Sequence, residues 1–202
     1  MRLEDNSVGY YDRDAAAFIR RYDALRFEDV QSGVLRFLPT PPASILDIGA
    51  GSGRDARALA ELGYDVTAVE PAAGFRTGAA EKAPKVRWID DRFPNLSSLN
   101  DERRSYDFIL CSAVLMLVQP EDIQVSFDAM ARLLAPGGKI AISVRDPVSN
   151  EPAEIFHRHE TNRLMSAAAA AGLHIIDTQE PSDALGRPTH RWRSIILSSE
   201  NL

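Results

Sequence analysis

The segment "ILDIGAGSGRDA", residues 45–56, joins an aliphatic run to a stretch with helical character. Its glycines alternate at Gly49, Gly51 and Gly53, and one acidic residue, Asp47, comes just before them. Glycine permits tight turns and a close approach of the backbone to a ligand. In open α/β sheets the first turn from strand to helix is the usual cradle for a nucleotide. The segment therefore predicts a parallel α/β fold that holds a ligand at this turn.

Short apolar runs of strand length recur along the chain. They cover residues 44–48, 65–70, 85–90, 106–113, 139–145, 173–177 and 191–198. Each is bounded by turn-forming or charged residues, as buried strands usually are. Helical patterns lie between most of them, and strands that alternate with helices imply a parallel sheet covered on both faces. Residues 178–190 have no helical period and predict a final antiparallel hairpin with a long loop.

Helical spacing of apolar or alanine residues marks the intervening segments. The predicted helices cover residues 30–38, 56–62, 123–134 and 160–172. Gly63, the "APGG" at 135–138 and Gly172 are expected to end the last three of them.

Length, composition and charge indicate the class of protein. A chain of 202 residues can bury one sizeable core. We therefore expect a single domain over 1–202, with a helical cap segment (1–44) above the top edge of an α/β core (45–202). The 45% hydrophobic and 26% charged content is typical of a soluble globular protein. A net charge of −6 disfavours a nucleic-acid partner.

Several further classes of protein are disfavoured by local features. No stretch reaches the roughly 18 apolar residues of a membrane span, so we expect no membrane partner. The first 18 residues carry acids where a secretory signal carries basic and apolar residues, which favours a cytoplasmic location. Cys111 is the only cysteine, which excludes an internal disulfide and a cysteine-bound zinc.

The spacing of the glycines distinguishes between cofactors. A dinucleotide fingerprint reads G-x-G-x-x-G, whereas here the pattern is G-x-G-x-G and Arg54 stands where the third glycine would be. Asp47 would place a carboxylate beside an approaching pyrophosphate, and it suits a ligand that carries positive charge. The lysine and hydroxyl residue that end a phosphate-binding loop are also missing. The turn therefore disfavours a pyrophosphate ligand.

Acidic residues also end the second and third strands. Glu70 lies 21 residues after Gly49, where a carboxylate can accept both hydroxyls of a ribose. In "WIDDRFPNL", Asp90 and Asp91 end the third strand, where a carboxylate can accept a hydrogen bond from an adenine amino group. One of the two aspartates can instead cap the following turn, and we favour Asp91 for the adenine.

Five ordered motifs carry a family resemblance. They are "ILDIGAGSGRDA", "VTAVEPA", "IDDRFPNL", "YDFILCSAVLML" and "LLAPGGKIAISV", and they cover residues 45–145. In order and spacing they resemble the class I S-adenosylmethionine-dependent methyltransferases. The resemblance implies a Rossmann-like three-layer α/β sandwich with a seven-stranded, mostly parallel sheet. Its implied strand order is 3-2-1-4-5-7-6 with strand 7 antiparallel, and its implied cofactor is S-adenosyl-L-methionine.

The resemblance also implies a cofactor site. The glycines would approach the methionine part, Asp47 would support its amino end, and Glu70 and Asp91 would take the ribose and the adenine. Tyr10, Tyr11 and Arg21 lie on a segment that in this family often folds over the cofactor, although the tyrosines can equally serve only to pack a helix on the sheet. The expected cofactor-binding residues are Tyr11, Arg21, Asp47, Gly49, Ala50, Gly51, Gly53, Arg54, Glu70, Pro71, Asp90, Asp91, Arg92, Cys111, Ser112 and Ala113.

A catalytic signature is not evident, and methyl transfer does not require one, because a base is needed only if the nucleophile must lose a proton. Related small-molecule enzymes often have a histidine after the fourth strand, where this chain has Leu117. The candidates that remain are His157 and His159, expected at the rim of the acceptor pocket, and Arg145 at the end of the fifth strand. His-x-His lacks a third ligand, so we expect no metal.

The leading prediction is methyl transfer to a small molecule by direct in-line displacement, in a monomer or homodimer. The asparagine-proline-proline-tyrosine type of motif used on bases or glutamine is missing after the fourth strand, where "CSAV" stands. One alternative is a cofactor-binding regulatory or partner subunit without transferase activity of its own. A third hypothesis is a nicotinamide-dependent reductase, which would bind a nicotinamide cofactor.

Overall fold

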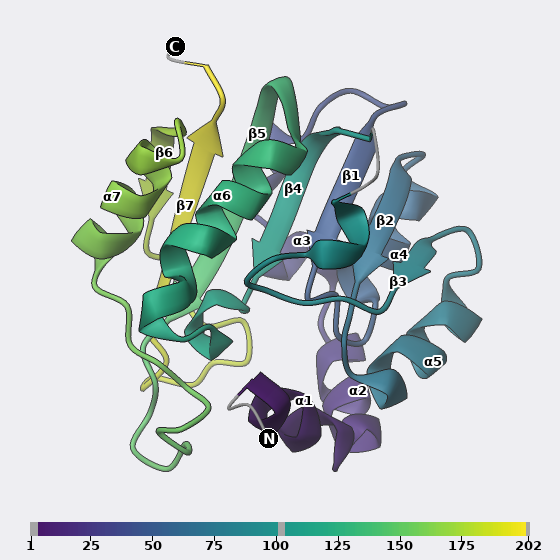
Figure 1. The fold of residues 1–202 in the computed structure, drawn as a ribbon. Helices are drawn as coiled ribbons and strands as arrows, with labels where there is room; N and C mark the ends of the chain where they lie inside the picture. The colour runs from purple at the N-terminus through teal and green to yellow at the C-terminus, as the bar shows by residue number, and fades with distance from the viewer. Residues whose placement is uncertain (1–3, 101–103, 201–202) are drawn as a thin grey trace.

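The computed structural model describes residues 4–100 and 104–200, which form one seven-stranded sheet (Figure 1). The strands are β1 (Ser44–Ile48), β2 (Asp65–Val69), β3 (Arg87–Ile89), β4 (Tyr106–Ser112), β5 (Leu134–Arg145), β6 (His174–Gln179) and β7 (Trp192–Ser198). Their order is β3-β2-β1-β4-β5-β7-β6. β1 to β5 pair in parallel, whereas β7 is antiparallel to both β5 and β6. The predicted strand order and antiparallel seventh strand are confirmed.

The chain order reverses between β1 and β4, the two central strands. β1 pairs with β2 on one side and with β4 on the other. Its last four residues are all buried, as expected for a parallel strand covered on both faces. In open α/β sheets a ligand crevice forms beyond the carboxyl ends of the strands at such a reversal. The turn at Gly49–Gly53 leaves β1 at this point.

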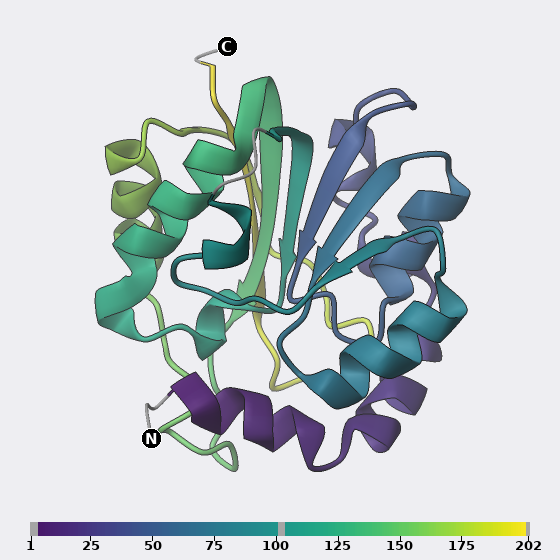
Figure 2. The same ribbon diagram turned by 45° about the vertical axis from the view of Figure 1, so that its right-hand side comes forward.

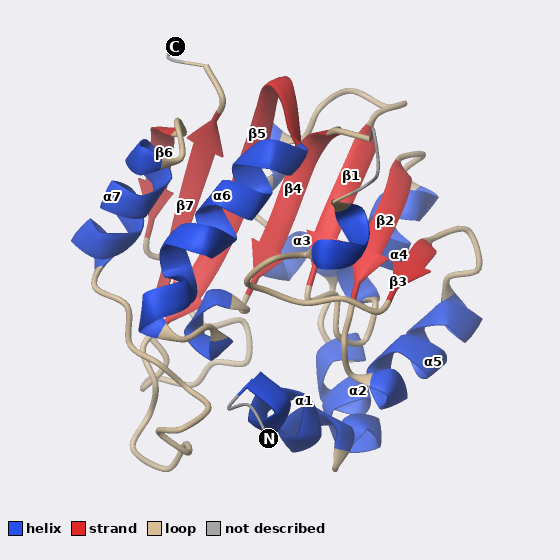
Figure 3. Ribbon diagram, viewed as in Figure 1, coloured by secondary structure: helices blue, strands red, loops and turns tan. Residues whose placement is uncertain are grey.

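Helices cover both faces of the sheet and its carboxyl edge. They are α1 (Glu4–Asp12), α2 (Ala15–Asp23), α3 (Phe27–Val30), α4 (Arg54–Glu61), α5 (Ala73–Lys82), α6 (Ile123–Leu133) and α7 (Thr161–Ala170). α6 and α7 lie on the front face in Figure 3, with α3 and α4 behind the sheet. α1 and α2 lie below the carboxyl ends of the parallel strands (Figures 1 and 2), so the N-terminal segment covers the crevice.

Two apolar clusters stabilise these layers, one on each face. The larger joins buried residues of β4 and β5 to α6 and α7, with Phe127 and Ile142 among its members. The smaller includes Ile45 of β1, Leu59 of α4 and Phe108 of β4. Adjacent residues of one strand alternate between the clusters, because successive side chains in a strand point to opposite faces.

Two helix predictions are wrong in detail. Residues 30–38 do not form one helix: α3 ends at Val30, and a separate short turn covers Leu35–Phe37. Between them the carbonyl of Gly33 accepts a hydrogen bond from Gln179 Nε2 of β6 at 3.2 Å, so this backbone group is bonded to the sheet. Glycine is also a poor helix former.

The second correction concerns the end of α6. This helix ends at Leu133, and Leu134 is the first residue of β5 rather than the last of the helix face. Leu134 pairs with Tyr106, and the register then shifts so that Phe108 pairs with Lys139. The "APGG" segment therefore lies inside an irregular strand, and Gly137 supplies a φ of +73° for the bend.

Among the helices of residues 4–100 and 104–200, none combines the length and apolar character needed to cross a membrane.

Candidate active site

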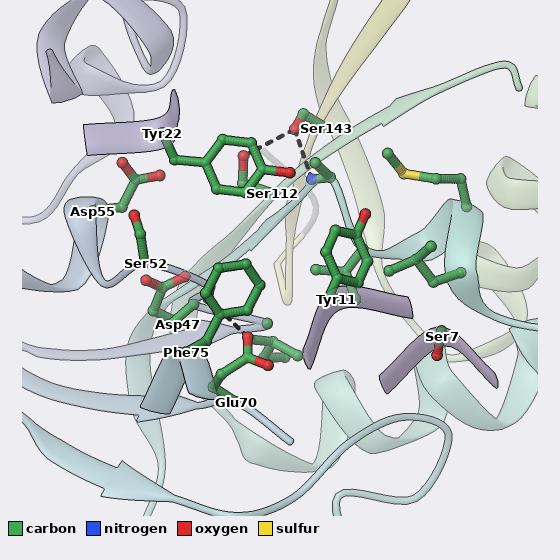
Figure 4. A pocket seen from close by; sticks show the side chains of 18 of the residues that line it. Ser7, Tyr11, Tyr22, Asp47, Ser52, Asp55, Glu70, Phe75, Ser112 and Ser143 are labelled. Carbon is green, nitrogen blue, oxygen red and sulfur yellow. Dashed lines mark hydrogen bonds between the residues drawn. The ribbon is translucent and has the colours of Figure 1, made fainter. Parts of the chain in front are cut away.

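A cavity of about 300 Å³ lies at the carboxyl edge of the sheet. The turns after β1, β2 and β4 line it, together with α1, α2 and the loop between β6 and β7. Figure 4 shows the carboxylates of Asp47 and Glu70 and the rings of Tyr11, Tyr22 and Phe75 around this space. Groups from several strands of the sheet therefore face one cavity.

The glycine turn forms one wall of the cavity. Gly49, Gly51 and Gly53 have φ values of +69°, +54° and +77°, a region that favours glycine. A Cβ on Gly49 would lie 2.4 Å from Val114, whereas a Cβ on Gly51 would meet nothing closer than a backbone oxygen 4.0 Å away. Gly51 therefore leaves space on the cavity side for a ligand to approach the backbone.

Asp47 lies at the bottom of this wall with only 2% of its surface exposed. Among the described residues, its Oδ2 atom has no hydrogen-bond partner. Burial, and then the nearby Asp55 carboxylate, raise the pKa of Asp47 well above its ordinary value. A buried carboxyl oxygen without a donor is costly unless it is paired. A ligand with an ammonium or sulfonium group would supply the missing partner.

Glu70 connects β2 to the glycine turn. Its Oε2 accepts a hydrogen bond from the Gly51 amide at 2.8 Å, and its Oε1 accepts one from the Ala72 amide at 2.8 Å. Burial raises its pKa to about 7, although the two amide donors oppose this shift. Each carboxyl oxygen has two lone pairs, so both can still accept a bond from a ligand hydroxyl.

The two aspartates after β3 have different surroundings. Asp90 is exposed and pairs with Arg76 at 2.8 Å, and it is not among the residues that line the cavity. Asp91 lines the cavity, and its Oδ2 accepts a hydrogen bond from the Ser98 amide at 2.7 Å. Asp91 therefore both fixes the following turn and faces the ligand space.

A polar network behind the glycine turn was not predicted from the sequence. Arg54 forms two hydrogen bonds with Asp55, at 2.6 and 3.0 Å. Gln31 Nε2 joins the Asp55 carboxylate (2.7 Å) to the Ser112 hydroxyl (3.1 Å). Gln31 comes from the irregular segment after α3, so no local pattern predicted its place at the carboxyl end of β4.

The comparisons with known proteins agree with this geometry. A family model described as "Methyltransferase domain" matches residues 22–195 of the chain. The chain belongs to this family. Its fold is that of the class I S-adenosylmethionine-dependent methyltransferases, and S-adenosylmethionine is the cofactor. Asp47, with its unpartnered oxygen, and the open space at Gly51 fit a ligand that carries an ammonium and a sulfonium.

Among named relatives of this methyltransferase domain, a ubiquinone biosynthesis O-methyltransferase from Xanthomonas oryzae pv. oryzae is 28% identical over 163 residues. The match covers 78% of this chain but only 58% of that relative's length. An arsenite methyltransferase from Mus musculus is 34% identical over 113 residues, which are 49% of this chain and 30% of that protein.

Solved structures show the same fold. A TehB-like SAM-dependent methyltransferase from Corynebacterium glutamicum matches with a TM-score of 0.70 at 17% identity. The match covers 95% of this chain and 99% of that one. An S-adenosylmethionine-dependent methyltransferase from Mesorhizobium loti has a TM-score of 0.66 at 17% identity, with 84% and 97% covered.

The structure brings most of the predicted cofactor residues of this methyltransferase domain to the cavity. Those that line it are Tyr11, Asp47, Gly49, Ala50, Gly51, Arg54, Glu70, Pro71, Asp91, Arg92, Ser112 and Ala113. Ala113 has a φ of +61°, and its amide donates to the Ser143 carbonyl at 2.9 Å. Such strain in a residue other than glycine is often found at functional sites.

Five residues that the sequence analysis singled out for this site lie elsewhere. Cys111 is fully buried, because its side chain points into the larger apolar cluster on one face of the sheet. Gly53 packs under Trp88, and Asp90 is held by Arg76 as described above. Arg21 lies over the Phe18 ring, 5.6 Å from its centroid. Tyr10 contacts Phe156 rather than the ligand space.

The catalytic candidates are also placed differently from the prediction. Arg145 lines the cavity, but its guanidinium forms a two-pronged ion pair with Glu151. His159 is 1% exposed and its Nε2 lies 2.9 Å from the Leu115 carbonyl oxygen. In the described part of the chain neither His157 nor His159 lines the cavity. The expected place at a pocket rim is therefore not found at this cavity: His159 packs against the Leu115 carbonyl, and the His157 amide donates to the Met116 carbonyl at 2.7 Å.

The loop between β6 and β7 forms a wall that sequence reasoning missed. Residues 181–185, Arg187 and Trp192 line the cavity, and we call these residues the hairpin wall. Trp192 falls in the predicted strand 191–198, whereas no helical or strand period marks residues 181–187 in the sequence. Their one signal was the length of the loop, since long loops in compact domains are often functional.

Proposed function

We propose that this methyltransferase domain transfers the methyl group of S-adenosylmethionine to a small-molecule acceptor by direct in-line displacement. One observation carries the proposal: the glycine turn and the hairpin wall face a single cavity that α1 and α2 also line. A cofactor and a second, small molecule can therefore meet in one cavity.

Residues on the β1–β3 side are suited to hold the cofactor. Asp47 would pair with its positive charge, Glu70 would accept the ribose hydroxyls, and Asp91 would face the adenine. When bound, the cofactor supplies a methyl group activated by a sulfonium. The backbone at Gly51 would contact the methionine part, because the space that a side chain would fill there is open.

Alignment and exclusion of water are the contributions expected of the protein. Correct placement of two reactants can supply on the order of 7–11 kcal/mol of barrier reduction. Tyr11 of α1 and Tyr22 of α2 line the cavity, and burial raises the pKa of both phenols. They therefore remain neutral near pH 7 and serve as walls and hydrogen-bond donors rather than as bases.

The test uses cofactor with a labelled methyl group and a fractionated metabolite extract. We expect label to appear in a compound of low molecular mass, together with release of S-adenosylhomocysteine. The Gly51→Val variant, which fills the cradle, should release none. Cofactor binding without product in any fraction would support the partner-subunit alternative, and label in protein or nucleic acid would contradict a small-molecule acceptor.

A further inference from the structure

Asp183 is the centre of the hairpin wall. Its side chain is 4% exposed, and its carboxylate accepts five hydrogen bonds. The donors are the amides of Leu185 (3.1 Å) and Arg187 (3.0 Å), Arg187 Nε (2.9 Å) and Nη2 (2.7 Å), and Trp192 Nε1 (2.8 Å). One buried carboxylate thus fixes the turn of the loop and attaches it to the first residue of β7.

The contacts continue from Trp192 to Arg145, its partner on the neighbouring strand β5. The Arg145 guanidinium lies 5.9 Å from the Trp192 ring centroid and 5.5 Å from that of Phe156. Glu151 holds the other edge of this guanidinium through two hydrogen bonds. The orientation of the indole is therefore set by Asp183 on one side and by Arg145 on the other.

Charges on this side of the cavity are paired within the chain. Arg187 is matched by Asp183, and Arg145 is matched by Glu151. Burial alone would raise the pKa of Asp183, but the bonds from Arg187 and Trp192 hold that pKa well below its ordinary value. Asp183 therefore remains ionised, and the two guanidiniums on the hairpin side of the cavity, Arg145 and Arg187, each have a carboxylate partner.

We propose that Asp183 is a positioning residue that selects the methyl acceptor. It holds the hairpin wall and Trp192 in place, and it cancels the charge of Arg187, so that the wall accepts an uncharged planar molecule and rejects an anion. The inference rests on the proposed function, because it assigns the hairpin side of the cavity to the acceptor.

Two probes of matched shape test this proposal: 4-methylcatechol, which is uncharged, and 3,4-dihydroxybenzoate, which carries a carboxylate. Their affinities are measured by calorimetry on protein loaded with S-adenosylhomocysteine, and again without it. Wild-type protein should bind the uncharged probe about tenfold more tightly. Asp183→Asn leaves Arg187 without a carboxylate partner. The affinity for 4-methylcatechol should therefore fall about fivefold, and the affinity for 3,4-dihydroxybenzoate should rise about fivefold.

Three further variants separate positioning from folding. The double variant Asp183→Asn/Arg187→Gln should not show the higher affinity for the anion that is expected of Asp183→Asn. Arg187→Gln alone leaves Asp183 without its cationic partner, so the affinity for 3,4-dihydroxybenzoate should fall below that of wild type. Asp177→Asn removes a comparable ion pair with Arg36 outside the cavity and should match wild type. In the Trp88→Phe background, the emission of Trp192 should shift when its donor bond to Asp183 is changed.

The outcomes are distinct. Affinity for S-adenosylhomocysteine should remain unchanged in every variant. An unchanged ratio of the two probes in Asp183→Asn, or no binding of either probe to wild type, would overturn the proposal, as would a parallel loss of S-adenosylhomocysteine binding. If wild type does not bind S-adenosylhomocysteine, the proposed function fails, whereas the titrations without it still decide the role of Asp183.

Discussion

The two sides of the cavity treat charge in opposite ways. On the glycine-turn side, Asp47, Asp55 and Glu70 bring three buried carboxylates together, and Asp47 keeps one oxygen without a partner among the described residues. On the hairpin side, Arg145 and Arg187 are each matched by an acid of the same chain. On the first side Asp55 is paired with Arg54 and Glu70 accepts two amide bonds, so Asp47 alone lacks a partner for one oxygen. On the second side both guanidiniums have a carboxylate partner.

This difference indicates how the two sides divide the work. Unpaired buried acids cost folding free energy, and a cationic ligand offsets that cost when it binds. Charges that are paired within the chain attract an ionic ligand only weakly. Shape and apolar contact then determine which ligand binds. Cofactor affinity should therefore depend on single residues of the glycine turn, whereas selection of the acceptor should depend on a whole wall.

The largest expected effect is on Gly51→Val. A valine at φ +54° places its side chain in the open space beside the cavity, so affinity for S-adenosylmethionine should fall about a hundredfold or more. Gly172→Val is the matched control, because Gly172 has φ +77°, open surroundings and a place at the end of α7. Both variants should lose about 1–2 kcal/mol of stability. Equal affinities by calorimetry would show that the cradle is not at this turn.

The next effect separates stability from binding at Asp47. Asp47→Asn removes a buried charge beside Asp55 and Glu70, so the free energy of unfolding should rise by about 1 kcal/mol. Affinity for S-adenosylmethionine should fall about thirtyfold, since a charge-assisted contact is lost. Urea unfolding and calorimetry measure the two quantities. Asp90→Asn, outside the cavity, is the control and should change neither. A loss of stability in Asp47→Asn would mean that the bonds of this carboxyl group within the chain outweigh the cost of its burial.

A smaller effect is the pH dependence of Glu70. Its pKa of about 7 in the folded chain lies above the ordinary value of 4.5. Between pH 4.5 and pH 7 the folded state therefore keeps a proton on Glu70 that the unfolded state has released. The stability that this proton contributes is lost as the pH rises through 7. Ionised Glu70 is the better acceptor for ribose hydroxyls, so cofactor affinity should rise about fivefold from pH 6 to pH 8. Glu70→Gln should flatten both profiles, and an unaltered affinity profile would remove Glu70 from the site.

The smallest effect is expected in the segment between β5 and α7. His157 does not line the cavity, and burial lowers its pKa. His157→Gln should leave the rate of methyl transfer within about twofold of wild type. The rate is followed by release of S-adenosylhomocysteine at a fixed acceptor concentration. A loss of a hundredfold would restore this histidine as a catalytic residue and extend the acceptor site beyond the hairpin wall.

Prediction from the sequence succeeded where the signal is local. Strand periodicity, the alternating glycines and the acids at strand ends are set by a few neighbouring residues, and the sheet order followed from the family resemblance. Cys111 shows the limit of the approach: it precedes Ser112 in β4, yet it points into the core. The pleat of the strand, rather than proximity in sequence, decided which of the two faces the ligand.

The sequence by itself determined the alternation of strands and helices and the glycine turn, because each depends on residue type and short-range spacing. Only the tertiary structure decided the hairpin wall. Asp183, Arg145 and Trp192 come from separate segments, and their charges and rings become one surface only when β7 pairs with β5 and β6. Ion pairing and ring contacts act over a few ångströms in space, and the sequence does not encode that proximity as a local pattern.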